Sequence, residues 1–349
     1  MTNTKLWFYF GLAIICFALG VNTAASQTLT WSRGEQYDDG NDPSVAVHSS
    51  GLVLDGHRSH IGNALWYRLG ELNKTGTGVT WGGSQRLPGV GAGGLQNWPN
   101  VAITREGYVI FVYSLGGIKI DGDLYYVVGK INPNGDTNQS ITWLTDKIHF
   151  DAGFHSSIAI NENGVILLAF ESGSGGNGLY YRVGHLSNPA GGDYTIQWDS
   201  GQYGVHYDDG INPHIALNNL NEVVEVHQVS STEGILHYRR GNVFLGTINF
   251  GGSQRYDPNA SEPAVALLDS GLVVELHRSS LDRTEARTGM LSPSNPEGID
   301  WSNSFVTISN PDASSPAVAS NGRYAIGTWD RHVFSAEDRI LEYSVAAIP

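Results

Sequence analysis

Three copies of a short motif, in which an acid and a histidine stand two residues apart, carry the side chains best suited to chemistry. The copies are Asp55/His57/Arg58, Glu225/His227/Gln228 and Glu275/His277/Arg278. In a β-strand, alternation places the acid and the histidine on one face. The carboxylate can then fix the imidazole tautomer, as a catalytic base or a metal ligand requires. The same position holds Tyr113 and Phe170 in other parts of the chain, so the pattern also indicates a packing position for a flat ring.

A second set of polar residues follows the tryptophan-containing segments. It consists of Tyr37-Asp38-Asp39, Tyr207-Asp208-Asp209 and Tyr256-Asp257. Asp, Asn and Gly in such runs favour turns, because the side chains bond their own backbone and glycine supplies positive φ. Carboxylate oxygens also suit calcium. Since no complete D-x-D-x-D-G loop and no zinc-type histidine spacing occurs, we predict no cofactor and keep calcium as the alternative.

These two sets define the candidate site, which we expect on one rim of the molecule. The residues expected to bind a ligand are Asp38, Asp39, His57, Arg58, Tyr207, Asp208, His227, Gln228, His277, Arg278 and Trp329. If the protein is an enzyme, the residues expected to act in catalysis are His57, His277, Tyr37, Tyr256, Arg58 and Arg278. We predict no metal ligands.

An internal repeat positions these residues. A P-x-[VI]-A tetrad recurs, with Ser156 replacing the proline in the third copy, and its alanines lie 50 to 57 residues apart: Ala46, Ala102, Ala159, Ala216, Ala266 and Ala319. We number the six repeats by these tetrads. After each tetrad come a turn, an apolar strand, a variable loop, a strand with an aromatic pair, and a strand with tryptophan or, in one copy, Phe250. Repeats of this length made of four short strands are typical of propeller blades.

The sequence therefore predicts an all-β fold, a six-bladed β-propeller of four-stranded antiparallel blades. The segment 29–34 precedes the first tetrad, and the last repeat ends on its third strand, 340–348. We expect the N-terminal strand to complete the last blade, which would close the ring and remove open sheet edges. The alternative is a β-helix or open array, which would leave the terminal copies unpaired. Gly is abundant (44 residues) and charged residues are sparse (15%), as in turn-rich β proteins.

The N-terminus has the pattern of a secretory signal. Lys5 precedes an apolar run from Leu6 to Val21, and Ala24 and Ser26 form a small-x-small cleavage site. We predict a signal peptide at 1–26 and a single propeller domain at 27–349, in a protein that is secreted, extracellular or periplasmic; an uncleaved anchor is the alternative. Cleavage removes Cys16, the only cysteine, and leaves no segment expected to insert in a membrane. The net charge of −14 argues against nucleic acid as a partner.

The repeat strings resemble a family of secreted microbial β-propeller repeats. The segments that carry the likeness are INPHIALNN with EVVEVHQ, SEPAVALLDSGLVVELHRSS, and the L-x-Y-R-x-G strands, and they span nearly all of 28–348. The resemblance implies the architecture and a lectin-like character. It brings no established activity.

We expect the partner to be a glycan or polysaccharide. Repetition favours a lectin-like protein with several similar sites, whose combined affinity exceeds that of each one. The alternative is a polysaccharide lyase, with His, Tyr and Arg on one face and the site at the divergent sixth repeat, near Trp329, Asp330, Arg331 and His332. A protein-binding scaffold is a further alternative. A glycosidase is less favoured, because no isolated acid pair stands out.

Overall fold

The structure is a computed structural model that describes residues 28–62, 64–90, 96–117, 120–132, 140–173, 176–188, 193–333 and 338–349. Every regular element in these ranges is a β-strand, from β1 to β28. The all-β prediction is therefore confirmed for the part of the chain described. Those residues include no helix long and apolar enough to cross a membrane.

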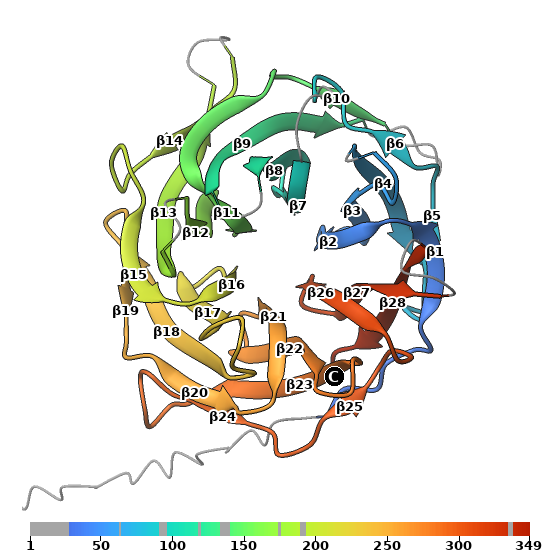
Figure 1. Cartoon of the computed structure of the whole chain (residues 1–349), viewed down its shortest axis with the longest axis vertical. Helices are drawn as coiled ribbons and strands as arrows, with labels where there is room; N and C mark the ends of the chain where they lie inside the picture. The colour runs from blue at the N-terminus through green and yellow to red at the C-terminus, as the bar shows by residue number, and fades with distance from the viewer. Residues whose placement is uncertain are drawn as a thin grey trace, which may run out of the picture.

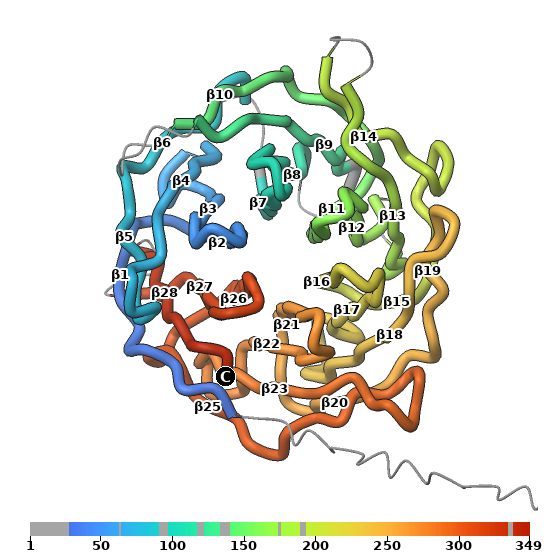
Figure 2. The backbone as a smooth tube through the Cα atoms, turned by 180° about the vertical axis from the view of Figure 1, so that it is seen from behind, coloured from blue at the N-terminus to red at the C-terminus, as the bar shows by residue number. Residues whose placement is uncertain are grey.

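The sheets stand around a central axis like the blades of a propeller (Figures 1 and 2). One strand of each repeat lies innermost, and the following strands lie progressively further out. The innermost strands are β2 (Asn41–Val47), β7 (Gln96–Ile103), β11 (Ile148–Ile160), β16 (Ile211–Leu217), β21 (Ala260–Leu267) and β26 (Ala313–Ser320). Each contains its repeat's P-x-[VI]-A tetrad or the serine-containing equivalent.

Three sheets share one order of strands, in which the fourth strand is followed by a short extra strand. They are β2-β3 (Leu52–Arg58)-β4 (Leu65–Leu72)-β5 (Val79–Trp81) with β6 (Gln85–Arg86); β16-β17 (Glu222–Gln228)-β18 (Leu236–Phe244)-β19 (Thr247–Phe250) with β20 (Gln254–Asp257); and β21-β22 (Leu272–Ser279)-β23 (Thr284–Leu291)-β24 (Ile299–Trp301) with β25 (Val306–Thr307). The fourth and the extra strand both pair with the third strand.

The second and third repeats share a nine-stranded sheet. Its strands are β7, β8 (Tyr108–Gly117), β9 (Ile120–Ile131), β10 (Ile141–Trp143), β11, β12 (Val165–Ser172), β13 (Gly178–Ser187), β14 (Thr195–Trp198) and β15 (Val205–Asp209). The first part of β11 pairs with β9 and the rest pairs with β12. The two repeats share a sheet because β11 runs without a break, whereas the backbone is interrupted at Gly40 and at Gly210 in the equivalent places of other repeats.

The remaining sheet joins the two ends of the described chain. Its order is β1 (Glu35–Asp39)-β28 (Arg339–Ala347)-β27 (Tyr324–His332)-β26. The segment 29–34, expected to be the outer strand, contributes only a bridge between Trp31 and Ala346, and the continuous pairing with β28 begins at Glu35. The outer part of this sheet is therefore split into two pieces, as it is in the sheets that contain β5 and β6 or β24 and β25.

The L-x-Y-R-x-G strands have a clear packing reason. The glycine lies opposite the tryptophan of the fourth strand, as Gly70 does opposite Trp81. A Cβ atom on Gly70 would lie 2.8 Å from Trp81 Cε3, so a larger residue would displace the indole. The arginine instead covers the indole: the Arg182 guanidinium lies 4.4 Å from the Trp198 ring centroid.

Side chains of neighbouring repeats satisfy the free edges of the innermost strands. The backbone N–H of Val101 donates to Ser44 Oγ at 3.1 Å, and that of Ile158 donates to Asn100 Oδ1 at 3.1 Å. The same contact follows from Ile215 to Ser157 Oγ at 3.0 Å and from Val265 to His214 Nδ1 at 3.2 Å. Inner-strand N–H groups thus find acceptors without a further strand.

Candidate functional site at one mouth of the axial channel

The acid–histidine motifs form three copies of one buried network that ties adjacent sheets together. In the first copy, Tyr37 Oη donates to Asp55 Oδ1 at 2.8 Å, and Asp55 Oδ2 lies 2.6 Å from His57 Nδ1. The second copy joins Tyr207, Glu225 and His227, and the third joins Tyr256, Glu275 and His277, with distances of 2.9 to 3.0 Å. A further carboxylate faces each His Nε2, at 3.6 to 3.8 Å: Asp38, Asp208 and Glu285.

These networks are closed to solvent. The three motif acids are fully buried, and the three histidines are no more than 2% exposed. Burial alone lowers the pKa of His277, but the charge of Glu275 and the hydrogen bonds of Glu275 and Glu285 raise it to about 10. Burial, reinforced by Glu275, holds the pKa of Tyr256 well above its usual value. The imidazoles are therefore held between carboxylates, and no ligand touches them without opening the fold.

The other repeats replace the acid and the histidine together. The equivalent pairs are Phe111/Tyr113, Leu168/Phe170 and Gly327/Trp329. An imidazole occurs at this position only where a carboxylate stands beside it, because a buried polar ring needs a partner. Trp329 is itself buried and donates its Nε1–H to Glu342 Oε2 at 2.8 Å.

The remaining acids of the predicted site lie in or near the same networks. Asp208 accepts from Arg239 Nε at 2.6 Å, and Asp38 lies 3.4 Å from Arg68. Asp39 is exposed and accepts from Gln36 at 3.1 Å. Asp38 and Asp208 therefore join adjacent sheets, and none of the three acids lines the hollow described next.

A hollow of about 510 Å³ opens at one mouth of the axial channel. Its rim is made by the first residues of the innermost strands and by Arg58, Arg278 and Arg339. We call it the Trp98 mouth. Arg58 and Arg278 are the two predicted site residues that line it.

Six residues with left-handed backbone conformations surround this mouth. They are Asp42, Trp98, His155, Asn212, Glu262 and Ser315, with φ between 41° and 51°. Non-glycine residues seldom adopt this conformation, and they cluster where function demands it. Each stands immediately before the tetrad, at a β-bulge where the pairing register shifts. A bulge redirects a side chain, and here six bulges turn side chains of five chemical kinds to one hollow.

Neighbouring repeats hold several of these backbones in place. Asp330 Oδ2 accepts from the N–H of Asp42 at 3.0 Å, and Glu171 Oε1 accepts from that of Asn212 at 2.6 Å. Gln228 Oε1 accepts from the N–H of Glu262 at 3.4 Å. In all three cases the acceptor comes from the second strand of another repeat, which is the last repeat for Asp42, and directly follows the His or aromatic position. Gln228, predicted as a ligand contact, therefore lies under the rim as a support.

The acidic side of the mouth is a connected group of charges. Arg58 Nε lies 2.9 Å from Asp42, and Arg278 lies 3.1 Å from Glu262. Ser315 joins the two acids: its Oγ donates to Asp42 Oδ1 at 3.3 Å and its N–H donates to Glu262 Oε2 at 2.7 Å. Every arginine at this mouth is paired, since Arg339 contacts Asp330 at 3.1 Å.

The opposite side of the mouth is aromatic. The rings of Trp98 and His155 lie 3.7 Å apart between centroids, and His155 Nδ1 is 2.6 Å from Glu171 Oε1. The mouth thus combines a flat aromatic surface with carboxylate and amide groups. Within the described ranges, no group of three or more His, Cys, Asp or Glu side chains is placed to hold a metal ion.

The six left-handed residues were missed by sequence reasoning. The available signal was positional: each directly precedes a repeated tetrad while itself varying from copy to copy. An Asp, a Trp and a Glu before Pro43, Pro99 and Pro263 read as ordinary loop residues. Only the bulge shows that they face one axis.

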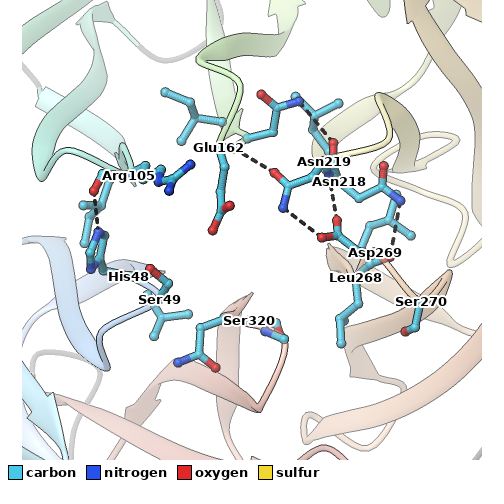
Figure 3. Close-up of a pocket in the computed structure, with 18 residues that line it drawn as sticks. His48, Ser49, Arg105, Glu162, Asn218, Asn219, Leu268, Asp269, Ser270 and Ser320 are labelled. Atoms are coloured by element: carbon cyan, nitrogen blue, oxygen red, sulfur yellow. Dashed lines mark hydrogen bonds between the residues drawn. The ribbon is translucent and has the colours of Figure 1, made fainter.

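The far end of the channel has a second, smaller hollow of about 310 Å³, lined by the turns after the innermost strands. Figure 3 shows Arg105 and Glu162 pointing toward its centre, and His48 bonded to the carbonyl of Arg105. Asn219 bonds Asp269 through both its N–H and its side chain, at 2.7 and 2.8 Å. These contacts link turns of neighbouring repeats.

No protein-family model and no curated protein matches the chain. Several solved structures resemble it. A Dyadobacter fermentans protein of unknown function has a TM-score of 0.58 at 10% identity, covering 93% of this chain and 99% of its own. A Penicillium chrysogenum α-L-arabinanase complexed with arabinobiose has a TM-score of 0.58 at 13% identity, covering 91% and 98%. A Fusarium graminearum α-L-arabinofuranosidase with an iminosugar inhibitor has a TM-score of 0.59 at 12% identity, covering 90% and 97%. At these identities the likeness concerns the fold, and the chain is a β-propeller.

Proposed function

We propose that this protein binds a neutral glycan at the Trp98 mouth, in one site per chain. The observation that carries the proposal is the ring of six left-handed residues, which brings an indole, an imidazole, two carboxylates, an amide and a hydroxyl to one hollow. Sugars present C–H faces that pack on aromatic rings and hydroxyls that bond carboxylates and amides. Because the six residues differ, this arrangement supports one composite site in place of several equivalent lectin sites.

The charges of the mouth favour a neutral ligand. A lyase would need a free cation to neutralise a uronate carboxylate. Arg58, Arg278 and Arg339 each already face a carboxylate. The histidines considered for proton transfer are buried between sheets, and the hydroxyls of Tyr37 and Tyr256 donate to Asp55 and Glu275, so the geometry supports the lyase alternative less well than neutral-glycan binding.

The similar structures support the same ligand class by analogy of fold. An arabinanase bound to arabinobiose, an arabinofuranosidase and a Trypanosoma rangeli sialidase are among them; the sialidase match has a TM-score of 0.55 and covers 55% of that chain. Fold and function separate readily in propellers, so the residues of the mouth carry the proposal and the analogy adds weight.

Hydrolysis of a glycoside is a second candidate, favoured by one observation. Asp42 and Glu262 both contact Ser315, so their bonded oxygens are at most about 9 Å apart, which does not exceed the separation known for glycosidase acid pairs. The test is release of reducing sugar from neutral polysaccharides. Asp42→Asn and Glu262→Gln should each abolish any release that the unmodified protein shows.

Titration calorimetry with purified protein 27–349 tests the binding proposal. The panel contains arabinobiose, xylotriose, cellotriose and an oligogalacturonate. We expect a neutral oligosaccharide to bind, and Trp98→Ala to weaken it about tenfold or more through loss of the aromatic surface. Tyr203→Ala is the matched control, because Tyr203 is an exposed aromatic residue outside the mouth. Equal losses in both variants, binding of the oligogalacturonate alone, or no binding at all would contradict the proposal.

We further propose that the ring has six blades and is closed by β1. The six tetrad-bearing inner strands support this count, with the nine-stranded sheet taken as two blades. The pairing of β1 with β28 and the bond from Asp42 to Asp330 support closure between the last repeat and the first.

We also propose that the protein is exported. The predicted signal peptide, 1–26, lies outside the described residues, so its sequence pattern is the support. Intact-mass measurement of protein recovered from culture medium or periplasm should find Gln27 as the first residue.

A further inference from the structure

The wall of the axial channel differs between its two sides. Behind the Trp98 mouth lies the narrow part of the channel, a hollow of about 120 Å³ that is lined by the innermost strands. In the first four repeats, the second residue of the tetrad supplies a hydrogen-bond acceptor for a backbone N–H of the next repeat. These residues are Ser44, Asn100, Ser157 and His214. These acceptors close the wall with side chains on that side.

Alanine takes this place in the fifth and sixth repeats. Ala264 stands where an acceptor for the N–H of Val318 would be, and Ala317 stands where one for Val45 would be. Val45 and Val318 occupy the register of Val101 and Val265, and they line the narrow part of the channel at 6% and 5% exposure. The backbone N–H groups of these two nearly buried residues therefore have no side-chain acceptor opposite them. Such donors are satisfied by water or by a ligand.

These donors lie on the acidic side of the mouth. Val45 and Val318 follow Asp42 and Ser315 by three residues on the same strands, roughly 10 Å along the axis. Asp42, Ser315 and Glu262 come from the first, sixth and fifth repeats, the same three repeats that border the alanines. The side chains of Asp42, Glu262 and Ser315 and the N–H groups of Val45 and Val318 thus form one continuous part of the channel wall. We call this part the sector.

We propose that a neutral glycan binds end-on in this sector, with oxygens of its terminal residue accepting hydrogen bonds from the N–H groups of Val45 and Val318. This inference rests on the proposed function and names its substrate class: oligosaccharides with a free chain end. The terminal hydroxyl groups enter the narrow channel, and the next sugar rests against Trp98. A volume of about 120 Å³ admits hydroxyl groups and excludes a chain of rings.

The test gives the two alanine positions the serine side chain that the first and third repeats have at the equivalent position. Ala264→Ser and Ala317→Ser each place a hydroxyl where Ser44 and Ser157 have theirs. We expect affinity for the oligosaccharide found above to fall about tenfold or more, while the melting temperature stays equal or rises. Ser44→Ala and Ser157→Ala are the matched controls, which should lower stability and leave affinity within about twofold. Cyclodextrin, which has no chain end, should not bind.

The outcomes separate this inference from the function beneath it. If the unmodified protein binds and Trp98→Ala abolishes binding, but both serine variants bind normally, the end-on mode is wrong and the Trp98 mouth stands. Binding of cyclodextrin as tight as that of the linear glycan would also overturn the end-on mode. If no glycan binds the unmodified protein, both proposals fail.

Discussion

The carboxylate of Asp330 accepts a hydrogen bond of 3.0 Å from the backbone N–H of Asp42. Almost the whole chain separates the two residues in sequence. They lie together because β2, the innermost strand of the first repeat, contacts β27, the second strand of the last repeat. Asp330 is fully buried and also contacts Ser314 and Arg339. One buried carboxylate therefore both fixes the left-handed backbone of a mouth residue and bridges the two ends of the fold.

The Asp330 contact predicts a specific pH dependence of stability. Burial, and then the charge of Asp42, raise the pKa of Asp330 to about 6, from 3.8 in an unfolded chain. The folded state holds the proton of Asp330 more tightly than the unfolded state does. The contribution of this group to the free energy of unfolding is therefore fully present below pH 3.8 and is lost as the pH rises through 6. Asp330→Asn should remove this component. The difference in unfolding free energy between wild type and variant should change by about 2–3 kcal/mol between pH 4 and 7.

Urea denaturation at several pH values measures this difference. Asp282→Asn is the control, because Asp282 is an exposed acid that also pairs with an arginine. A flat difference curve for Asp330→Asn would show that the carboxylate is ionised in the folded state throughout this range.

The network of Tyr256, Glu275 and His277 predicts strong coupling between substitutions. His277→Phe leaves the buried Glu275 without its cationic partner and should cost about 3–5 kcal/mol. The triple variant Tyr256→Phe, Glu275→Leu, His277→Phe copies the residues that the third repeat has, namely Phe150, Leu168 and Phe170. It should recover most of the lost stability, because it removes the three bonded groups together and leaves only Glu285, whose side chain is 21% exposed. Thermal and urea unfolding of the single, double and triple variants measure the coupling.

Additive losses across this series would show that the three side chains act independently. That result would contradict the packing interpretation of the motif and reopen a functional role for His277. The third repeat serves as the internal control, since Phe170→His alone should destabilise the fold by burying an unpaired imidazole.

Sequence periodicity sufficed for the β-propeller fold because each repeat carries its own local signals. The tetrads locate the innermost strands, and the glycines opposite the tryptophans locate the outer ones. The pairing of the chain ends could also be predicted, because the sequence has an extra strand before the first tetrad and lacks a fourth strand in the last repeat. The segment that pairs continuously with β28 is, however, Glu35–Asp39 and not 29–34. The shift arises because the outer strand is split, a feature that alternation alone does not reveal.

The mouth could not be derived in the same way. Whether a histidine faces a channel or a neighbouring sheet depends on how adjacent sheets pack, and strand alternation only says that His57 and Asp55 share a face. The residues that do reach the axis, such as Trp98 and Glu262, get there through bulges with positive φ. A bulge changes the register locally and leaves the alternation of polar and apolar residues on either side intact. The sequence pattern therefore does not reveal it.

The contact between Gly70 and Trp81 predicts sensitivity to one methyl group. Gly70→Ala places a Cβ at 2.6 Å from Val79 and 2.8 Å from Trp81, so the outer strand must shift. We expect a loss of about 1–3 kcal/mol. Ala346 occupies the equivalent position opposite Trp31, and Ala346→Gly should change stability by only about 1 kcal/mol or less. Chemical denaturation measures both, and indifference to Gly70→Ala would mean that the tryptophan strand is loosely held.

The pairing of β1 with β28 predicts how far the N-terminus can be shortened. A chain that begins at residue 41 lacks β1, so it exposes the edge of β28 and leaves Asp55 without the hydroxyl of Tyr37, whose ring also stacks on Trp81 at 4.7 Å. A chain that begins at residue 35 keeps these contacts and loses only the Trp31 bridge and its neighbours. We expect the shorter chain to melt about 5 °C or more below the longer one and to associate through the open edge. Calorimetry and size-exclusion chromatography of the two chains measure this, with 28–349 as the reference. Equal melting and monomeric behaviour of both would show that β1 is dispensable, and the proposed closure of the ring would then be wrong.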